Sequence, residues 1–278
     1  MSLRKLDNFL KNKVVLVTGA AGSIGLELSK QIYEMKPRKL LLLDNNETGL
    51  FDLWDELPKA EILLTDIRSS LDIDTIFERH KPQIVFHTAA YKHVKIGEMF
   101  PQVFRQNNVF GTRSLLNQQF EKFIFISTDK AVNPDCAMGK TKLECEKMCL
   151  EKENCIIVRF GNVMGSRGSL IPIWQKQLNE GKPLTVTDKR MKRFFMSIEG
   201  ACSLILKAAE IGKGGEIFIL DMGKSIKILE MAKQIASRIG CKIKMIGISK
   251  GEKLEEVLMT KEERKRAIKK KDFWIIKK

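Results

Sequence analysis

Short apolar runs that alternate with amphipathic stretches constrain the fold of this chain more than any other feature. Each run is rich in leucine or β-branched residues and is bounded by polar or turn-forming residues. Runs of this kind are typical of strands buried on both faces of a parallel sheet. Six strands separated by helical patterns, such as 23–35 and 71–80, predict a Rossmann-type doubly wound α/β fold. The six runs lie at 13–19, 39–44, 60–66, 82–90, 122–128 and 154–160.

The pattern loosens beyond residue 165. Residues 197–212 and 226–240 have the periodicity of helices, and 215–221 reads as one more buried strand. We predict that residues 1–166 form a dinucleotide-binding domain to which 193–224 return. Residues 167–192 and 225–278 are predicted to form a smaller substrate-binding lobe, with a basic tail, over the strand ends where ligands bind in such sheets.

Composition excludes several classes of protein. No run of about 18 apolar residues is present, so no membrane-spanning helix is expected. The N-terminal stretch is polar and basic and lacks the apolar centre of a signal peptide. The six cysteines are scattered, with neither pairing nor metal spacing, which predicts a reducing cytoplasm and no bound metal. Cys145 and Cys149 lie four apart on a predicted helix and are interpreted as small buried hydrophobes.

The net charge of +15 has two interpretations. Residues 261–278 contain nine Lys or Arg residues against three Asp or Glu residues, a net charge of +6. Such a tail can bind nucleic acid, an anionic membrane or an acidic partner. The alternative is a solvated helix with an apolar anchor, Phe273 to Ile276, that docks on the body. We favour the second interpretation and expect no nucleic-acid partner.

A glycine-rich loop follows the first predicted strand. Gly19, Gly22 and Gly25 permit a tight turn and a close approach of the backbone to a pyrophosphate, and Ser23 and Ile24 open the next helix. The free N–H groups at a helix N-terminus attract phosphates. A strand before the motif and a helix after it are the context that makes this pattern specific for a dinucleotide.

Acidic residues end the second and third predicted strands. Asp44 lies 19 positions after Gly25, where a carboxylate accepts both ribose hydroxyls and repels a 2′-phosphate, so NAD is favoured over NADP. Asp66 and Ile67 are predicted to lie near the adenine. The alternative for each aspartate is a helix cap or a turn.

Several motifs together resemble one family. They run in order from residue 18 to 258 and include TGAAGSIG, STDKAVNP followed by MGKTK, RFGNVMGSRGS and GEKLEEVL. The chain is similar to extended short-chain dehydrogenase/reductases (SDRs), and more narrowly to polysaccharide-biosynthesis UDP-N-acetylglucosamine 4,6-dehydratases. In that group a Tyr-x-x-x-Lys pair is replaced in some members by Met-x-x-x-Lys, and Met138 and Lys142 match the methionine kind, here without its membrane portion.

The resemblance implies a reaction. A 4,6-dehydratase oxidises C4 of a UDP-sugar with NAD, eliminates water across C5 and C6, and returns the hydride to C6. Asp129, protonated, is assigned as the acid for the C6 hydroxyl, and Lys130, neutral, as the base at C5. Thr128 is placed beside the C4 oxygen. The acceptor of the C4 hydroxyl proton stays open between an ordered water and a shuttle through Asp129.

Other site residues follow from the resemblance alone. Those expected to contact the cofactor are Ala89, Ala90, Tyr91, Asn108 and Lys142, the last at the nicotinamide ribose. Those expected near the substrate are Lys92, Asn162, Arg193 and Lys253. The family's Arg-Pro before Gly-Glu-Lys is replaced by Ser249 and Lys250, so that a bidentate phosphate contact is lost. His87 and His93 are given no role.

Three functions remain in competition. The first is a cytoplasmic NAD-dependent UDP-N-acetylhexosamine 4,6-dehydratase, homodimeric or larger by family habit. The second is a UDP-sugar 4-epimerase, which needs no base at C5. The third is a binding protein for nucleic acid or a partner that retains the dinucleotide fold. The pairing of Asp129 with Lys130 favours the first.

Overall fold

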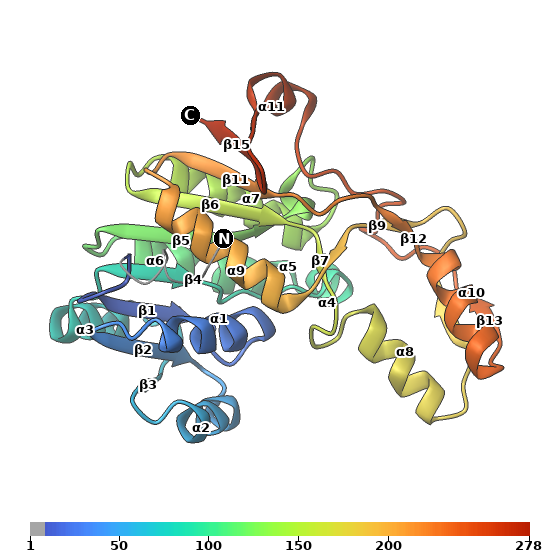
Figure 1. Cartoon of the computed structure of the whole chain (residues 1–278), viewed down its shortest axis with the longest axis horizontal. Helices are drawn as coiled ribbons and strands as arrows, with labels where there is room; N and C mark the ends of the chain where they lie inside the picture. Colours follow the sequence, from blue (N-terminus) through green and yellow to red (C-terminus); the bar gives the residue numbers. More distant parts are fainter. Residues whose placement is uncertain (1–8) are drawn as a thin grey trace.

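The main feature of the computed structural model, which describes residues 9–278, is a mostly parallel sheet (Figure 1). Within these residues it contains nine strands, and β15 and β14 are added antiparallel at one edge. The order confirms the predicted Rossmann-type sheet, and each predicted strand is present within three residues of its expected ends. The strands, in spatial order, are β14 (Ile268–Lys269), β15 (Phe273–Lys277), β11 (Glu216–Leu220), β6 (Cys155–Phe160), β5 (Lys122–Thr128), β4 (Ile84–His87), β1 (Val14–Thr18), β2 (Lys39–Asp44) and β3 (Glu61–Leu64).

Helices cover both faces of this sheet. Alternate strand residues point to opposite faces, so Val15 and Val17 enter one core and Val14 and Leu16 the other. Both cores are apolar, which is why the strands read as continuous hydrophobic runs. The first face carries α1 (Ser23–Glu34), α2 (Glu47–Glu56) and α9 (Ile198–Ile211), and the second carries α3 (Ser70–His80), α6 (Gly111–Leu116) and α7 (Ala137–Leu150).

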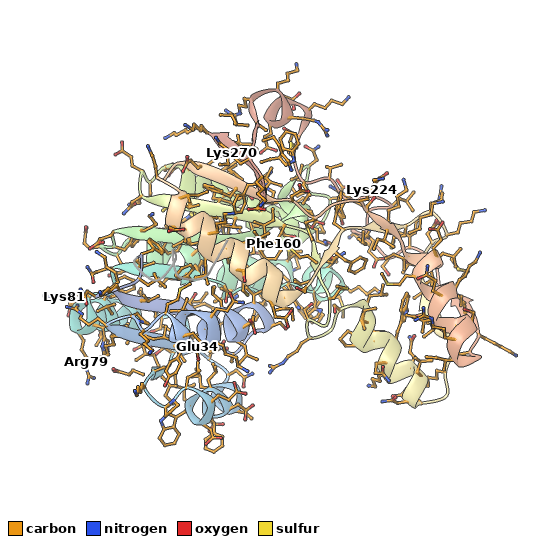
Figure 2. The ribbon with its side chains drawn as sticks, in the orientation of Figure 1. Glu34, Arg79, Lys81, Phe160, Lys224 and Lys270 are labelled. Atoms are coloured by element: carbon orange, nitrogen blue, oxygen red, sulfur yellow. The ribbon has the colours of Figure 1, made fainter. Side chains whose placement is uncertain are left out.

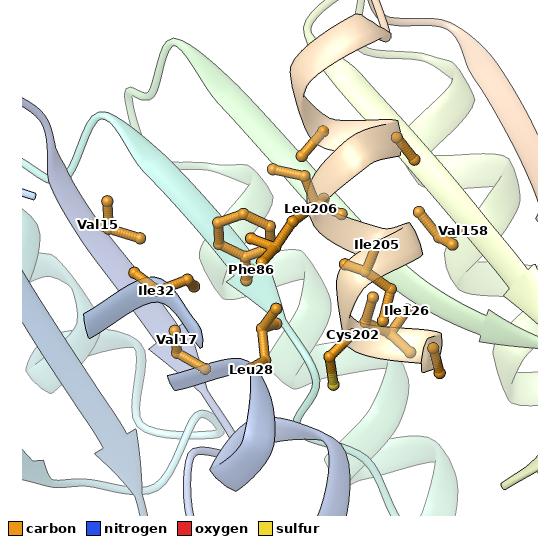
Figure 3. Packing of buried hydrophobic residues seen from close by; sticks show 14 of the residues in the cluster. Val15, Val17, Leu28, Ile32, Phe86, Ile126, Val158, Cys202, Ile205 and Leu206 are labelled. Atoms are coloured by element: carbon orange, nitrogen blue, oxygen red, sulfur yellow. The ribbon is translucent and has the colours of Figure 1, made fainter. Parts of the chain in front are cut away.

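Figure 3 shows the first core between α1 and α9. Leu28 and Ile32 of α1 lie next to Ile205 and Leu206 of α9, and all four rest on strand side chains such as Phe86. Each of these side chains is at most 1% exposed. Burial of one such side chain contributes roughly 1.5–3 kcal/mol to folding. The helix after the glycine loop is therefore held firmly on the sheet.

A smaller lobe lies to one side of the sheet, beyond β6 (Figure 1). Its separate core includes Trp174, Leu184, Met191 and Ile228, each no more than 5% exposed. The lobe contains α8 (Leu170–Asn179), α10 (Ile228–Ile239), β8 (Leu184–Val186) paired with β13 (Ile243–Met245), and β9 (Lys192–Arg193) paired with β12 (Ile226–Lys227). The short pair β7 (Asn162–Val163) and β10 (Phe195–Met196) joins it to the body.

Short helices at the strand ends complete the described chain. Two of them have special geometry: η2 (Gln106–Phe110) is a π-helix and η3 (Asp129–Ala131) a 3₁₀ turn. The remaining ones are α4 (Val94–Met99), α5 (Pro101–Arg105) and α11 (Lys261–Arg266). None of the helices in residues 9–278 is both long enough and apolar enough to cross a bilayer.

The C-terminal segment corrects the predicted lobe. Residues 268–269 and 273–277 belong to the main sheet, although they were assigned to the smaller lobe. Phe273 to Ile276 dock on the body as predicted, but as the strand β15 and not as an extension of a helix, because their backbone pairs with β11. The boundaries of the lobe otherwise stay a prediction.

A buried ion network ties the segment before α11 to the sheet. Arg159 on β6 is 2% exposed and donates to both oxygens of Glu146 on α7, at 3.0 and 2.6 Å. It also donates to Glu263 and to the carbonyl of Leu258. Glu263 closes the N-terminus of α11 in a capping box with Thr260. One arginine thus joins β6 to the preceding helix α7 and to a segment that lies 99 residues later in the sequence.

Charged side chains surround both parts of the molecule (Figure 2). Lys224, near the lobe, and Lys270, beside β15, are exposed. Arg79 and Lys81, at the C-terminal end of α3 on the side away from the lobe, are exposed as well. Basic side chains within the C-terminal segment are partly neutralised, since Lys269 pairs with Asp221. All six cysteines are free, and Cys145 and Cys149 lie in the second core, as predicted. Residues 1–8 of the predicted non-signal stretch lie outside the described residues.

Candidate active site

The glycine loop between β1 and α1 is built by close backbone contacts. Gly19 has φ of +71°, and a Cβ there would lie 2.5 Å from the backbone nitrogen of Ala89. A Cβ at Gly25 would overlap the carbonyl oxygen of Gly19. Gly22 precedes α1 as its N-cap, and no side chain caps the helix there. The first-turn N–H groups therefore face the loop, as anion binding requires.

A Gly25→Ala substitution tests this loop. Because the added methyl meets backbone that is fixed by the sheet, we expect destabilisation of about 1–3 kcal/mol and a large loss of dinucleotide affinity. Thermal unfolding with and without NAD measures both. Gly181→Ala is the control, since Gly181 has φ of +65° but open space around it; it should cost about 1–2 kcal/mol and leave binding unchanged. Equal ligand-induced shifts in the Gly25→Ala and unmodified proteins would contradict the prediction.

Asp44 faces the glycine loop. Its Oδ2 accepts from the backbone N–H of Ala21 at 2.9 Å, and its Oδ1 accepts from that of Asn46 at 3.0 Å. One cavity of about 260 Å³ is lined by residues of the glycine loop and by predicted cofactor residues: Gly19, Gly22, Asp44, Ile67, Ala89, Ala90 and Tyr91. The residues predicted separately for the cofactor are thus brought to one place at the carboxyl ends of the strands.

Asp66 is placed differently. Arg68 donates to both of its carboxylate oxygens and holds the pKa of that carboxyl below its usual range. Asp66 is not among the residues that line the cavity, whereas its neighbour Ile67 is. These contacts agree with the alternative interpretation, in which Asp66 is a turn residue.

Ser23 and Ile24 support the loop. The hydroxyl of Ser23 accepts from the backbone N–H of Arg167 at 3.0 Å, and Arg167 also lines the cavity. The carbonyl of Ile24 accepts from the thiol of Cys202 on α9. Sequence reasoning missed Arg167, because the motif GSRGS served only for the family resemblance.

Asn108 and His87 stabilise the wall of the cavity. Asn108, on η2, accepts from the backbone N–H of Tyr91 and donates to its carbonyl and to Thr141. His87 is fully buried, with hydroxyls of Thr18 and Thr112 at 2.7 and 2.8 Å from its two ring nitrogens. Burial, and then the charge of Lys142, lower the pKa of His87 to about 3, so the ring is neutral. His87 is a packed residue, in agreement with the absence of a predicted role.

The Asp129–Lys130 pair lies in η3, directly after β5. Asp129 is fully buried, and its Oδ1 accepts from the ammonium of Lys130 at 3.0 Å and from the hydroxyl of Thr128 at 2.9 Å. The other oxygen, Oδ2, has no hydrogen-bond partner among the described residues. The Lys130 side chain is 19% exposed, so the pair opens toward solvent on its lysine side. An exposed surface ion pair is therefore not the correct description.

A second carboxylate faces the same lysine. Glu256, from the C-terminal segment, is 4% exposed, and its Oε1 lies 3.7 Å from the Lys130 nitrogen. Its Oε2 is likewise without a partner in the part of the chain that the structure describes. Sequence reasoning missed Glu256, because nothing in the run Glu255-Glu256 tells which of the two carboxylates turns inward.

The charge of Lys130 differs from the prediction. Burial alone would lower its pKa, but the negative charges of Asp129 and Glu256 outweigh burial and raise the pKa above its usual value. Lys130 is therefore protonated in this state, whereas a C5 base was expected to be neutral. Two carboxylates around one ammonium are the physical reason.

Met138 and Lys142, both on α7, are buried. Met138 is 3% exposed and packs with Phe104 and Cys136. Lys142 is 7% exposed, donates to the carbonyl of Ile126 at 2.8 Å, and lies 4.5 Å from the ring centre of Phe125. Burial lowers the pKa of Lys142. It does not line the cavity of the glycine loop, so its contact with a ribose stays a prediction.

Two of the predicted substrate residues, Arg193 and Lys253, hold the backbone of neighbouring segments. Arg193 is 9% exposed and donates to the carbonyls of Lys192, Leu254 and Lys253. Lys253 donates to the carbonyls of Val132 and Asn133. Both side chains thus fasten backbone in this state. Asn162 lies on β7. The pKa of Lys92 is lowered by burial and by the charge of Arg167.

Lys250 lies in the segment that the resemblance places at a phosphate, and here it pairs with a carboxylate. Lys250 is 85% exposed and lies 3.7 Å from Glu98. Glu98 in turn accepts from the backbone N–H of Ala137 at the start of α7.

No three His, Cys, Asp or Glu side chains within residues 9–278 are grouped as a metal site would need.

Comparison with known proteins gives consistent relatives. A family model described as "Polysaccharide biosynthesis protein" matches residues 15–278. The capsular polysaccharide biosynthesis protein CapD of Staphylococcus aureus is 41% identical over 95% of this chain and 48% of its own length. An inverting UDP-N-acetylglucosamine 4,6-dehydratase of Campylobacter jejuni is 34% identical over 90% of this chain and 78% of its own.

Two further similarities bear on the fold and the reaction. A UDP-glucose 4-epimerase of Rickettsia rickettsii is 34% identical over 95% of this chain and 83% of its own. The crystal structure of Pen from Bacillus thuringiensis has a TM-score of 0.92 and 34% identity, with 97% of this chain and 89% of that chain covered. The chain spans about half the length of CapD.

Proposed function

The chain belongs to the polysaccharide biosynthesis protein family and has the extended SDR fold, and from this premise we propose that it is an NAD-dependent nucleotide-sugar 4,6-dehydratase. Its substrate is a UDP-N-acetylhexosamine, with UDP-N-acetylglucosamine as the first candidate, since one relative bears that name. The observation that carries the proposal is the buried Asp129–Lys130 pair at the end of β5. The cytoplasmic location and the homo-oligomer stay predictions.

The residues present fit a dinucleotide. Gly19 and Gly25 leave no room for side chains between loop and sheet, and the free N-terminus of α1 faces the cavity. Asp44 lines that cavity with a carboxylate that would bind ribose hydroxyls and repel a 2′-phosphate, which favours NAD over NADP. When bound, NAD supplies the redox chemistry at C4 and C6 of the sugar.

The contacts suggest a route for the C4 hydroxyl proton. Thr128 donates to Asp129 at 2.9 Å, so a proton that enters at Thr128 can pass to Asp129. The Thr128 hydroxyl is too weakly acidic to replace a tyrosinate. As a relay, it passes its own proton to Asp129 while it receives the C4 hydroxyl proton, and so it carries no lasting charge. Asp129, once protonated, is the acid that the departing C6 hydroxyl requires. The proton of the C4 hydroxyl thus leaves in the eliminated water.

The C5 proton requires a different group. Lys130 is adjacent to Asp129, and its side chain is partly exposed. A sugar that enters from solvent would therefore meet the lysine. As a free amine it takes the C5 proton, and it returns a proton to C5 after C6 has been reduced. An acid for the C6 hydroxyl and a base for the C5 proton on adjacent residues suit elimination across C5 and C6.

The epimerase is the second candidate, because a relative that bears that name covers 95% of this chain. An epimerase must let the 4-keto sugar turn over within the site and needs no base at C5. A third reading, a noncatalytic binding protein, leaves the burial of an acid–base pair without a purpose. Lys130 therefore favours the dehydratase over both.

Proton NMR of the protein with NAD and UDP-N-acetylglucosamine in deuterated buffer tests the proposal. We expect a new C6 methyl signal and deuterium at C5, since Lys130 exchanges its proton with solvent. Formation of the galacto epimer without a methyl signal would make the protein an epimerase. The absence of any reaction with this and other UDP-sugars would overturn the enzyme proposal.

A further inference from the structure

The buried carboxylate of Glu256 is not used by the chemistry above. It lies in a segment, 249–258, whose backbone is fastened on both sides. Arg193 holds the carbonyls of Lys253 and Leu254, and Arg159 holds that of Leu258. The approach of Glu256 to Lys130, at 3.7 Å, is therefore built into the fold.

The charged and titratable groups that act on Lys130 come from its own turn and from three other segments. Asp129 lies on its own element, Glu256 comes from the C-terminal segment, Arg193 comes from β9, and the thiol of Cys136 precedes α7. Only the two carboxylates can accept a proton from an ammonium. Asp129 and Glu256 each retain one buried oxygen without a partner among residues 9–278.

The proposed reaction requires a group that accepts the proton carried by Lys130 at the start of the cycle. The cycle starts with Lys130 protonated between two carboxylates, and oxidation at C4 sends a second proton to Asp129. Elimination then needs Asp129 protonated and Lys130 neutral at the same moment. The proton of Lys130 must therefore move to a group other than Asp129.

We propose that Glu256 is the proton store of this site: it accepts the proton of Lys130 before elimination and returns it afterwards. This inference rests on the proposed function. In the elimination step the neutral Lys130 amine takes the C5 proton, and Asp129 gives its proton to the C6 hydroxyl, which leaves as water. After reduction at C6, Lys130 gives a proton to C5, Glu256 returns its proton to Lys130, and the starting charges are restored. Glu256 touches no substrate atom and acts only through Lys130.

A Glu256→Gln enzyme tests the proposal, with Glu255→Gln as the matched control. Glu255 carries the same charge on the preceding residue, but its side chain is 57% exposed and faces Lys192. With Gln, Lys130 can lose its proton only to solvent. We expect elimination to be about 100-fold slower near pH 6 and to recover toward pH 9, whereas the unmodified and Glu255→Gln enzymes stay nearly flat over that range.

The half-reactions separate this role from a structural one. Oxidation at C4, followed as absorbance of the reduced dinucleotide in a single turnover, should be retained in Glu256→Gln, while C5 deuterium exchange is lost at low pH. Glu256→Asp keeps a carboxylate and should keep the flat profile at a reduced rate. The same pH profile in the Asp and Gln variants, or a flat profile in Gln, would overturn the proposal.

A measurement without substrate distinguishes failure of this inference from failure of the proposed function. In protein labelled with ¹³C and ¹⁵N in lysine, the Lys130 signal is identified by its absence in Lys130→Met. Its pKa should be lower in Glu256→Gln than in Glu255→Gln, because an opposite charge has been removed. No difference would overturn the inference even where the unmodified enzyme is active, and a difference would stand where the UDP-sugar assay fails.

Discussion

A Lys130→Met enzyme is expected to bind dinucleotide normally but to lose turnover by about 10²–10⁴-fold, the range that a positioned proton-transfer group contributes. Methionine has a similar length but cannot take the C5 proton. The loss should fall on elimination, so the C6 methyl signal and the C5 deuterium both disappear while oxidation at C4 continues. NMR of the sugar and single-turnover absorbance measure the two halves separately.

Lys140→Met is the control for this variant. Lys140 is an exposed lysine on α7, close in sequence to the pair but outside it. Its replacement should leave both halves of the reaction unchanged. C5 exchange at the unmodified rate in Lys130→Met would remove Lys130 from the role of base and would assign the C5 proton to another group.

Replacing Arg159 by methionine is expected to lower the free energy of unfolding by about 3–5 kcal/mol. The substitution leaves Glu146, which is 1% exposed, and the half-buried Glu263 without their common partner. It also frees the carbonyl of Leu258, and with it the segment that carries Glu256. Denaturant unfolding followed by circular dichroism gives the loss.

Two comparisons define the cause of that loss. Arg190→Met removes an exposed ion pair with Asp188 and should have no measurable effect. Adding Glu146→Gln and Glu263→Gln to Arg159→Met should restore part of the stability, because the uncompensated charges are removed. An Arg159→Met loss no larger than that of Arg190→Met would show that the network does not support the fold.

The same network predicts a dependence of stability on pH. Burial would raise the pKa of Glu263, but Arg159 and the capping N–H lower it below its ordinary value of 4.5. A carboxyl with a lowered pKa stabilises the fold above its unfolded pKa and loses that contribution as the pH falls through the folded value. The unmodified protein should lose this increment below about pH 4.5, and Arg159→Met should not.

Much of the fold could be predicted from local patterns. The runs 39–44 and 122–128 coincide with β2 and β5, because a buried parallel strand leaves an unbroken apolar signature. The helix 226–240 was found as α10 within two residues. The C-terminal segment was assigned wrongly in part, since its run of Phe273 to Ile276 reads equally well as a helix anchor or as an edge strand.

The candidate site divides in the same way. Gly19, Gly25 and Asp44 were found because the glycine loop and the end of the next strand are close in sequence and fixed in spacing. Asp129 and Lys130 were found through motifs that resemble a family. Arg167 and Glu256 were missed, since each reaches the site from a segment with no pattern of its own.

The sequence by itself determined the parallel sheet, the glycine loop with its acidic partner and the adjacent Asp129 and Lys130. These depend on neighbours along the chain: the period of a strand, the absence of a Cβ, the adjacency of residues 129 and 130. Only the tertiary structure decided that Arg159 joins α7 to the segment before α11, that β15 completes the sheet, and that Lys130 is protonated. The reason is that a buried charge depends on every charge around it, and Glu256 comes to Lys130 from the C-terminal segment.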